Sequence, residues 1–281
     1  MAQLSAKVGK GPFVPLKYIS ESSLGTVFQT VFGVNEKYTD IVGEFLQSIE
    51  QIQKIFTERF QKFWLHVDII YNMTKLKAKQ DKQIKLLHKL SNMVLQDRKL
   101  QMKTKELADS DIQNVNEEKF KPFLDFLLEL SKGDGVISDQ EIREEVDTFI
   151  IAGHDTTSYV LIYTLIAIGS YPEVQEKIFE ELQDLVGGSG RDITKHDLHK
   201  LVYLEAVIKE SIRLYPIAPI ISRYADTEVK LKNYTIPSGC SIFLLYWGMH
   251  HHSLWGPDAA DFKPERWLDP AKLPANSNVF A

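Results

Sequence analysis

The sequence predicts a mainly α-helical protein with small β-sheets near its C-terminus, and three observations support this fold class. Long stretches of the first 215 residues repeat apolar side chains at steps of three and four, the spacing of amphipathic helices. Short strand-like stretches between turn residues follow residue 216. Proline and capping signals mark the start of several helices. We expect one domain over residues 1–281, helical to about residue 215 and followed by a small-sheet region from about 216 to 281.

The first helices are predicted from apolar stripes alone. Residues 16–32 and 41–64 each carry such a stripe, and residues 75–102 form a lysine-rich helix with a buried stripe of its own. We interpret the basic face of that helix as a solvated surface. The polar residues 108–118 are the best candidate for a loop.

The later helices have start signals. A short apolar helix is expected over residues 123–130. Ser138 and Glu141 have the spacing of a capping box, so a long helix should begin there and run to about residue 170. Pro172 begins the next helix, because a proline at the first helical position loses no hydrogen bond. A last helix covers about 201–215.

The C-terminal region changes from helical to strand-like patterns. Residues 229–231, 234–236 and 241–246 are predicted strands separated by turns, and the tail from Gly256 is rich in proline and irregular.

Composition and charge limit the classes of function. The net charge of −5 argues against nucleic acid as the main partner. Cys240 is the one cysteine, which excludes an intrachain disulfide and suits a reducing compartment or the cytosolic side of a membrane. We predict no signal peptide, no membrane anchor and no membrane span, and we expect the apolar residues 156–171 to form a buried helix.

The residues around Asp134 partly match a calcium-binding loop. Asp134, Gly135 and Glu141 match the second half of an EF-hand loop, but Leu130 and Lys132 then stand where oxygen ligands are required. The capping box explains Glu141 better.

The long helix contains an acid beside an alcohol. Gly153 is unfavourable in a helix by about 1 kcal/mol relative to alanine, and it gives the backbone room for a bulky group to approach. The Thr156 hydroxyl can bond to the carbonyl of Ala152, and Asp155 next to Thr156 suits proton delivery to a bound oxygen ligand. The same residues also fit a partly exposed bend of the helix. We expect the ring of His154 to pack at the edge of the helix.

Other polar residues admit two interpretations each. Glu210 and Arg213 lie three apart on one helix face, either as an exposed pair or as a buried pair with Arg266 as a further partner. Arg223 is either a carboxylate-binding arginine or a surface residue at the start of a strand. Three consecutive histidines, 250–252, cannot converge on one metal ion, so we favour a packing role for them. Cys240 is expected to be a small buried residue.

Three segments together resemble one enzyme family. Residues 145–157 resemble the oxygen-activating helix of cytochrome P450 monooxygenases, particularly family 4. Glu210 with Arg213, and residues 262–267, resemble the E-x-x-R and F-x-P-E-R-[FW] motifs of the same family. The resemblance implies an incomplete cytochrome P450 fold, and it covers nearly all of this chain but about half of a full enzyme.

The resemblance also implies roles for individual residues. Thr156 would stand beside the iron-bound dioxygen, and Asp155 would belong to its proton relay. Glu210, Arg213 and Arg266 would support the haem's thiolate side structurally. The remaining expectations are cofactor binding by Ala152, Gly153, Thr157 and Arg223, the last to a haem propionate, and a substrate pocket lined by Phe149, Ile150, Ile217, Ala218 and Ile220.

Two features qualify the resemblance. Some family 4 members carry a glutamate, ester-linked to the haem, at the position of Ala152, so haem b without a covalent link is expected here. The family's cysteine loop should follow within a few residues of Phe280, but the sequence ends at Ala281, and Cys240 is not expected to replace that ligand.

The expected function is therefore that of a fragment of a haem-dependent monooxygenase, inactive as given. The complete enzyme would hydroxylate an apolar substrate, such as a fatty acid, hormone or xenobiotic. Its electrons would come from NADPH through a cytochrome reductase or from a cytochrome b-type donor. It would lie on the cytosolic face of the endoplasmic reticulum membrane, where residues 63–65 would contact the membrane surface or else pack in the core. The alternative is a truncated, non-catalytic relative that acts as a binding protein or has no function.

Overall fold

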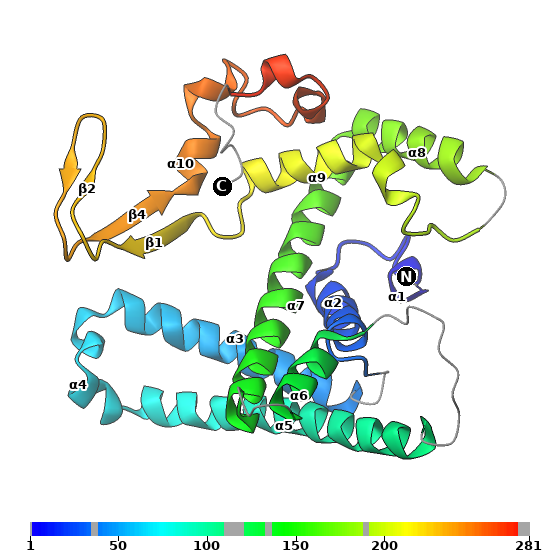
Figure 1. Ribbon diagram of the computed structural model, residues 1–281. Helices are drawn as coiled ribbons and strands as arrows, with labels where there is room; N and C mark the ends of the chain where they lie inside the picture. The colour runs from blue at the N-terminus through cyan, green and yellow to red at the C-terminus, as the bar shows by residue number, and fades with distance from the viewer. Residues whose placement is uncertain (1, 35–38, 110–120, 133–136, 188–190, 275–281) are drawn as a thin grey trace. The chain divides into compact units, whose positions relative to one another are not determined.

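The protein is mainly helical with two small β-sheets, as the sequence predicts (Figure 1). This computed structural model describes all residues except 1, 35–38, 110–120, 133–136, 188–190 and 275–281. The chain divides into two compact units, residues 1–158 and 159–281. The boundary lies inside one long helix, α7 (Asp139–Ser170). That the whole chain is a single domain stays a prediction, and each unit is described by itself.

Unit 1 consists of helices. Its elements before α7 are α1 (Ala2–Ser5), α2 (Leu16–Thr30), α3 (Thr39–Gln61), η1 (Phe63–His66), α4 (Asp68–Asn72), α5 (Lys75–Asp109) and α6 (Phe123–Lys132). The helices predicted from apolar stripes are confirmed. The lysine-rich helix is longer than predicted, and the predicted helix over residues 41–64 ends at Gln61, after which η1 begins. The predicted loop over residues 108–118 lies almost wholly outside the described residues.

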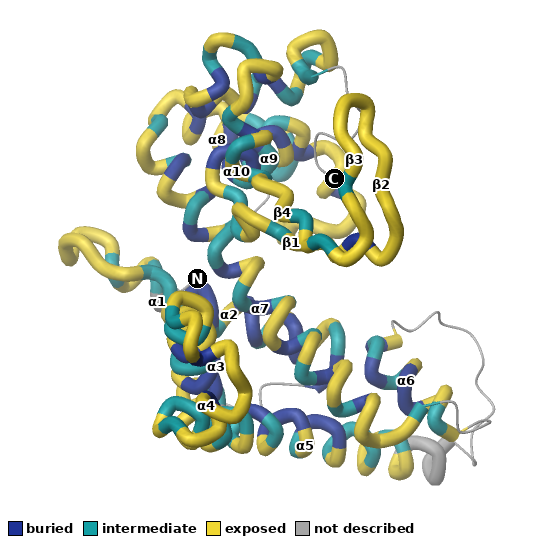
Figure 2. Tube along the Cα trace, turned by 90° about the vertical axis from the view of Figure 1, so that its left-hand side faces the viewer, coloured by how far each residue is buried: buried dark blue, intermediate teal, exposed yellow. Residues whose placement is uncertain are grey.

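The core of unit 1 forms where the apolar stripes of these helices meet. Figure 2 shows the buried stretch of α5 as a dark segment of the tube. Burying such side chains contributes about 1.5–3 kcal/mol each, which stabilises the arrangement of α2, α3, α5, α6 and the first half of α7. The most deeply buried members, drawn from four of these five helices and the residues after α2, are Leu24, Phe32, Val34, Leu90, Val94, Leu124, Ile142 and Ile150.

Unit 2 combines the end of α7 and three further described helices with two short sheets and a series of 3-10 turns. The elements after α7 are α8 (Pro172–Val186), η3 (Leu198–Lys200), α9 (Val202–Leu214), β1 (Ile220–Tyr224), β2 (Val229–Lys230), β3 (Thr235–Ile236), β4 (Ser241–Leu245), α10 (Tyr246–His250), η4 (Ser253–Trp255), η5 (Pro264–Trp267) and η6 (Pro270–Lys272). β1 pairs antiparallel with β4, and β2 pairs antiparallel with β3.

The structure corrects the prediction around residue 246. We expected a strand through Tyr246, but β4 ends at Leu245 and the next five residues form α10. The amide of Trp247 donates to the carbonyl of Pro219 at 3.2 Å, which turns the chain away from the strand direction.

α7 bears on the expectation that nothing in the chain spans a membrane, which stays a prediction. Among the described residues, α7 is the helix that is long and apolar enough to cross a bilayer by length and composition. Core helices of soluble proteins pass the same test, so this property alone decides nothing.

Candidate functional site

The N-terminus of α7 is fixed by the predicted capping box. The backbone amide and the hydroxyl of Ser138 both donate to Glu141 Oε2 at 2.7 Å, and the Glu141 amide donates back to Ser138 Oγ at 3.3 Å. These bonds from Ser138 lower the pKa of Glu141. The residues that a calcium site would also need, 133–136, lie outside the described part of the chain.

The acid–alcohol pair lies in the middle of α7. Thr156 Oγ1 donates to the carbonyl of Ala152 at 2.6 Å, which confirms the predicted bond. Ala152, Thr156 and Thr157 are exposed within unit 1, and Asp155 is half-buried. One side of α7 therefore presents a small residue, a hydroxyl and a carboxylate together.

Asp155 has a partner that the sequence did not suggest. Gln53 of α3 donates from Nε2 to Asp155 Oδ2 at 2.6 Å, across 102 positions of sequence. Glutamines are common on helix surfaces, so no local signal marks this one.

Gly153 lies where α7 approaches another helix closely. A Cβ built on Gly153 would stand 2.9 Å from Val27 Cγ2 of α2. Glycine is needed here because α2 and α7 approach closely. Cofactor binding by Gly153 stays a prediction.

His154 packs inside unit 1, as the sequence favours. Its ring is 2% exposed, and Nδ1 donates to the carbonyl of Ile150 at 2.8 Å. The ring centroid lies 6.3 Å from that of Phe45, and Ser23 Oγ donates to the His154 carbonyl at 3.1 Å.

The predicted pocket residues are distributed over both units. Phe149 is half-buried with its ring centroid 4.5 Å from that of Phe123. Ile150 is completely buried in the core of unit 1, and its role in a substrate pocket stays a prediction. In unit 2, Ile217 is half-buried and Ala218 and Ile220 are exposed. A pocket-lining role for these three residues stays a prediction.

Glu210 of α9 is the centre of a buried ion cluster in unit 2, formed by Glu210, Arg213, Arg266 and Trp267. Arg213 donates to both carboxylate oxygens at 2.8 Å, and Arg266 Nε donates to Oε1 at 2.9 Å. Trp267 Nε1 donates to Oε2 at 2.9 Å, and the Lys263 amide donates to Oε1 at 3.0 Å. The Glu210 and Arg213 side chains are 0% exposed and that of Arg266 is 4% exposed, so the pair is buried, with Arg266 as its predicted partner.

The arginines of the cluster also bind the backbone of the C-terminal turns. Arg213 donates to the carbonyls of His250, Ala259 and Asp261 at 2.7, 2.7 and 3.2 Å. Arg266 donates to the carbonyls of Trp255 and Asp258 at 3.2 and 3.0 Å. The face of Trp255 covers the Arg213 guanidinium, with the ring centroid 5.0 Å away. One carboxylate and two cations thus organise the irregular chain from residue 250 to residue 267.

The carboxylate of Glu210 is held in its ionised form by its neighbours. Burial by itself raises the pKa of Glu210, but the hydrogen bonds from Arg213, Lys263 and Arg266 outweigh it and lower the pKa. A buried carboxylate with this many donors has its desolvation compensated. The arrangement holds structure and offers no accessible group for chemistry.

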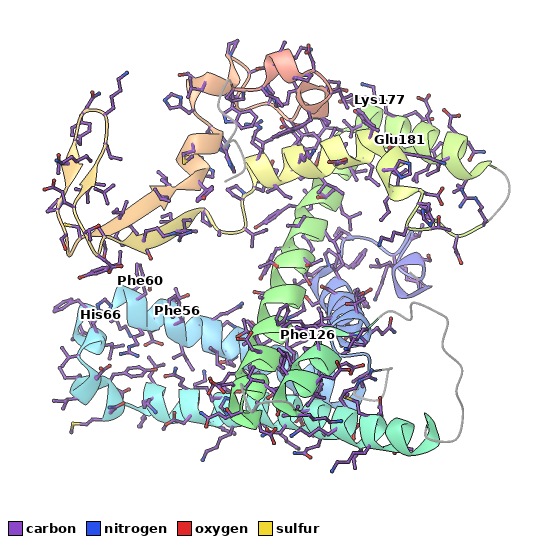
Figure 3. All side chains as sticks on the ribbon, viewed as in Figure 1. Phe56, Phe60, His66, Phe126, Lys177 and Glu181 are labelled. Carbon is purple, nitrogen blue, oxygen red and sulfur yellow. The ribbon has the colours of Figure 1, made fainter. Side chains whose placement is uncertain are left out.

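A second carboxylate attaches α9 to α8. Glu181 accepts from the amides of Tyr203 and Leu204 at 2.6 and 3.0 Å, so it satisfies two donors at the N-terminus of α9. Lys177, one turn earlier on α8, forms an ion pair with Glu265 at 2.5 Å, and Glu265 also accepts from the Tyr203 hydroxyl at 3.0 Å. Figure 3 shows Lys177 and Glu181 on α8. Burial and the neighbouring Glu265 raise the pKa of Tyr203.

The three consecutive histidines have separate environments. His250 is buried, and its Nδ1 donates to the carbonyl of Arg213 at 3.1 Å. His251 stacks on Trp247 with centroids 4.4 Å apart, and His252 Nδ1 accepts from the Leu254 amide at 3.2 Å. These are packing and capping roles, as favoured from the sequence. In the described part of the chain, no group of three or more metal-binding side chains gathers.

Arg223 and Cys240 lie in or beside the β1–β4 sheet. Arg223 is exposed on β1, opposite Ile242 of β4, and donates to the carbonyl of Ser222 at 2.9 Å. Cys240 is half-buried just before β4. Within the described part of the chain, neither position is bonded to a side chain that would assign it a role, so propionate binding by Arg223 stays a prediction.

Comparison with known proteins decides the family. The sequence profile described as Cytochrome P450 matches residues 1–280. The chain belongs to the cytochrome P450 family. It is 33% identical to cytochrome P450 4c21 of Blattella germanica and 32% identical to cytochrome P450 4V2 of Homo sapiens, in each case over 95% of this chain. These alignments cover 54% and 51% of the relatives, so the chain spans about half their length.

A solved structure supports the fold of this P450 chain. A zebrafish cytochrome P450, determined with progesterone, superimposes with a TM-score of 0.75 over 97% of this chain and 60% of that one. The sequence identity is 22%, so this likeness concerns the fold.

Proposed function

We propose that the chain is part of a haem-dependent monooxygenase that activates dioxygen and hydroxylates an apolar substrate. The observation that carries the proposal is the exposed side of α7, where Ala152, Asp155 and Thr156 stand together. The small side chain of Ala152 leaves room for a flat macrocycle. An acid next to an alcohol can pass protons from solvent to an oxygen ligand. Membership of the cytochrome P450 family agrees with this role.

The residues fit haem at the positions that the structure leaves accessible. Ala152 has no carboxylate, so haem b would be held without an ester link. Thr156 and Thr157 would line it from α7, and the exposed guanidinium of Arg223 suits a propionate. When bound, haem supplies the redox chemistry of oxygen activation. Asp155 and Thr156 would hold and move the protons. Glu210, Arg213 and Arg266 would support the haem's thiolate side structurally, without touching substrate.

The substrate and redox partner are proposed by class. An apolar molecule such as a fatty acid, a hormone or a xenobiotic suits Ile217, Ala218 and Ile220 as contacts, with Phe149 at the edge of the α6–α7 core. NADPH would act indirectly, through a cytochrome reductase or a cytochrome b-type donor. Nucleic acid is not proposed as a partner, because the chain carries a net charge of −5.

An exposed apolar patch on unit 1 supports contact with a membrane surface. The patch comprises side chains of α3, η1, α4 and the residue after it, with exposures of 68% for Phe60, 76% for Phe63, 75% for Ile69 and 84% for Met73. Figure 3 shows Phe60 near the end of α3 and His66 in the turn beyond it. Apolar side chains that are gathered in this way mark an interaction surface. We place the complete enzyme on the cytosolic face of the endoplasmic reticulum membrane.

The decisive experiment extends the reading frame beyond Ala281 and expresses the complete protein. A cysteine loop in the extended sequence, and a carbon-monoxide difference spectrum of thiolate-ligated haem, are the expected results. Thr156→Ala should then lower product formed per reductant consumed by about 10- to 100-fold. A stop codon confirmed in the transcript after Ala281, with no haem bound by the purified chain, would instead support a truncated binding protein.

A further inference from the structure

Gln53 connects α3 to the acid of the acid–alcohol pair. Its Nε2 lies 2.6 Å from Asp155 Oδ2, and both residues belong to unit 1. An amide donor holds one carboxylate oxygen without adding a charge. The other oxygen, Oδ1, then remains available for exchanging a proton.

The position of Gln53 is fixed by the packing of α3. Ile49, one turn before Gln53, and Ile55, on the opposite side of the helix, are 4% and 3% exposed and anchor α3 in unit 1. The side that carries Gln53 continues with Phe56 and Phe60, which are 69% and 68% exposed (Figure 3). Gln53 therefore lies between a buried anchor and exposed aromatic side chains, and its side-chain amide is bonded to Asp155.

We propose that Gln53 is a positioning residue for Asp155. By binding Oδ2 it holds the side-chain torsions of the acid, so that the proton is delivered from one fixed atom next to Thr156. This inference rests on the proposed function, because it assigns to Asp155 the proton relay of a monooxygenase. It adds a residue on a second helix, without which that relay is loosely oriented.

The first test needs no haem and measures the interaction itself. Gln53→Met keeps the length of the side chain but removes its donor, and Asp155→Ala removes the acceptor. In a double-mutant cycle of urea unfolding on the complete protein, the two effects should fall short of additivity by about threefold or more in the folding equilibrium constant. The matched control is Gln47→Met, an exposed glutamine six residues earlier on α3, which should add to Asp155→Ala without coupling. Additive effects for Gln53 and Asp155 would overturn the proposal.

The second test follows the protons in the haem-loaded protein. When their delivery fails, two electrons and two protons reduce dioxygen to hydrogen peroxide, which is released without product. Gln53→Met should raise the share of electrons recovered in peroxide about threefold or more and change the solvent deuterium isotope effect, while KM for substrate stays within about twofold. Gln47→Met should change neither quantity.

The outcomes separate this inference from the proposed function. If Asp155→Asn raises peroxide release and Gln53→Met does not, the positioning role is wrong and the monooxygenase proposal stands. If Asp155→Asn itself leaves peroxide release unchanged, the acid has no part in proton delivery, and both the relay and the role of Gln53 are refuted. If the complete wild-type protein and all of these variants lack the haem spectrum, the proposed function is refuted.

Discussion

Replacing Glu210 with glutamine is the sharpest test of how unit 2 is held together. Glutamine keeps the shape of the side chain but removes its charge, and its amide group must face donors of Arg213 or Arg266. Glu210 is 0% exposed and accepts hydrogen bonds from five donor atoms. Removing one partner of a buried ion pair costs about 3–5 kcal/mol. Since the free energy of unfolding of a whole domain is about 5–15 kcal/mol, Glu210→Gln should remove a large part of it.

Urea denaturation followed by tryptophan fluorescence measures this loss directly. Trp267 donates to Glu210 and Trp255 covers Arg213, so both fluorophores report on the cluster. The matched control is Glu205→Gln on the same helix. Its ion pair with Lys209, at 2.6 Å, is exposed and should contribute no more than about 0.5 kcal/mol. A Glu210→Gln midpoint that moves no further than the Glu205→Gln midpoint would refute the reasoning.

Acid adds a second readout for Glu210. Because its pKa is lower in the folded protein than in the unfolded chain, its contribution is complete above the ordinary carboxylate pKa of about 4.3. That contribution is lost as the pH falls through the folded-state pKa. The wild-type protein should therefore lose stability on acidification more steeply than Glu210→Gln does. Parallel acid profiles would show that the charge of Glu210 contributes nothing.

Two further predictions concern close packing and pH. Gly153→Ala brings a Cβ to 2.9 Å from Val27, and this overpacking should cost about 1–3 kcal/mol in thermal unfolding, more than the gain in helix propensity. Adding Val27→Ala should restore part of the loss, and a more stable single variant would contradict the packing. Burial lowers the pKa of His250, so the unfolded chain binds the proton more readily. Stability should therefore fall as the pH drops below about 6.5, and His250→Gln should flatten that part of the profile of melting temperature against pH.

What could be predicted from the sequence depends on how local each interaction is. The capping box at Ser138 and the bond from Thr156 to Ala152 join residues three or four positions apart, so the helical repeat alone brings them together. The bond from Gln53 to Asp155 spans 102 positions, and only the packing of α3 against α7 creates it.

The sequence is ambiguous where one residue type meets two physical needs. A helical glycine such as Gly153 signals that something comes close, and this signal predicts room for a cofactor. The close neighbour is Val27, and the sequence does not distinguish a helix from a ligand. Similarly, the apolar pattern around Ile150 indicates that this side chain is buried, but it does not identify the residues that pack against it. The core of unit 1 surrounds it.

The bonds from Arg213 and Arg266 to backbone carbonyls have an evolutionary consequence. A carbonyl is present whatever the side chain, so positions such as Ala259 and Asp261 are held without any demand on residue identity. The segment between α10 and η5 can therefore accumulate substitutions while its path stays the same. The residues that should not vary are the three with ionised side chains, Glu210, Arg213 and Arg266. A saturation library over residues 251–267 should show tolerance at exposed positions such as Asp261 and intolerance at Arg266, and substitutions of Glu210 and Arg213 should be equally damaging.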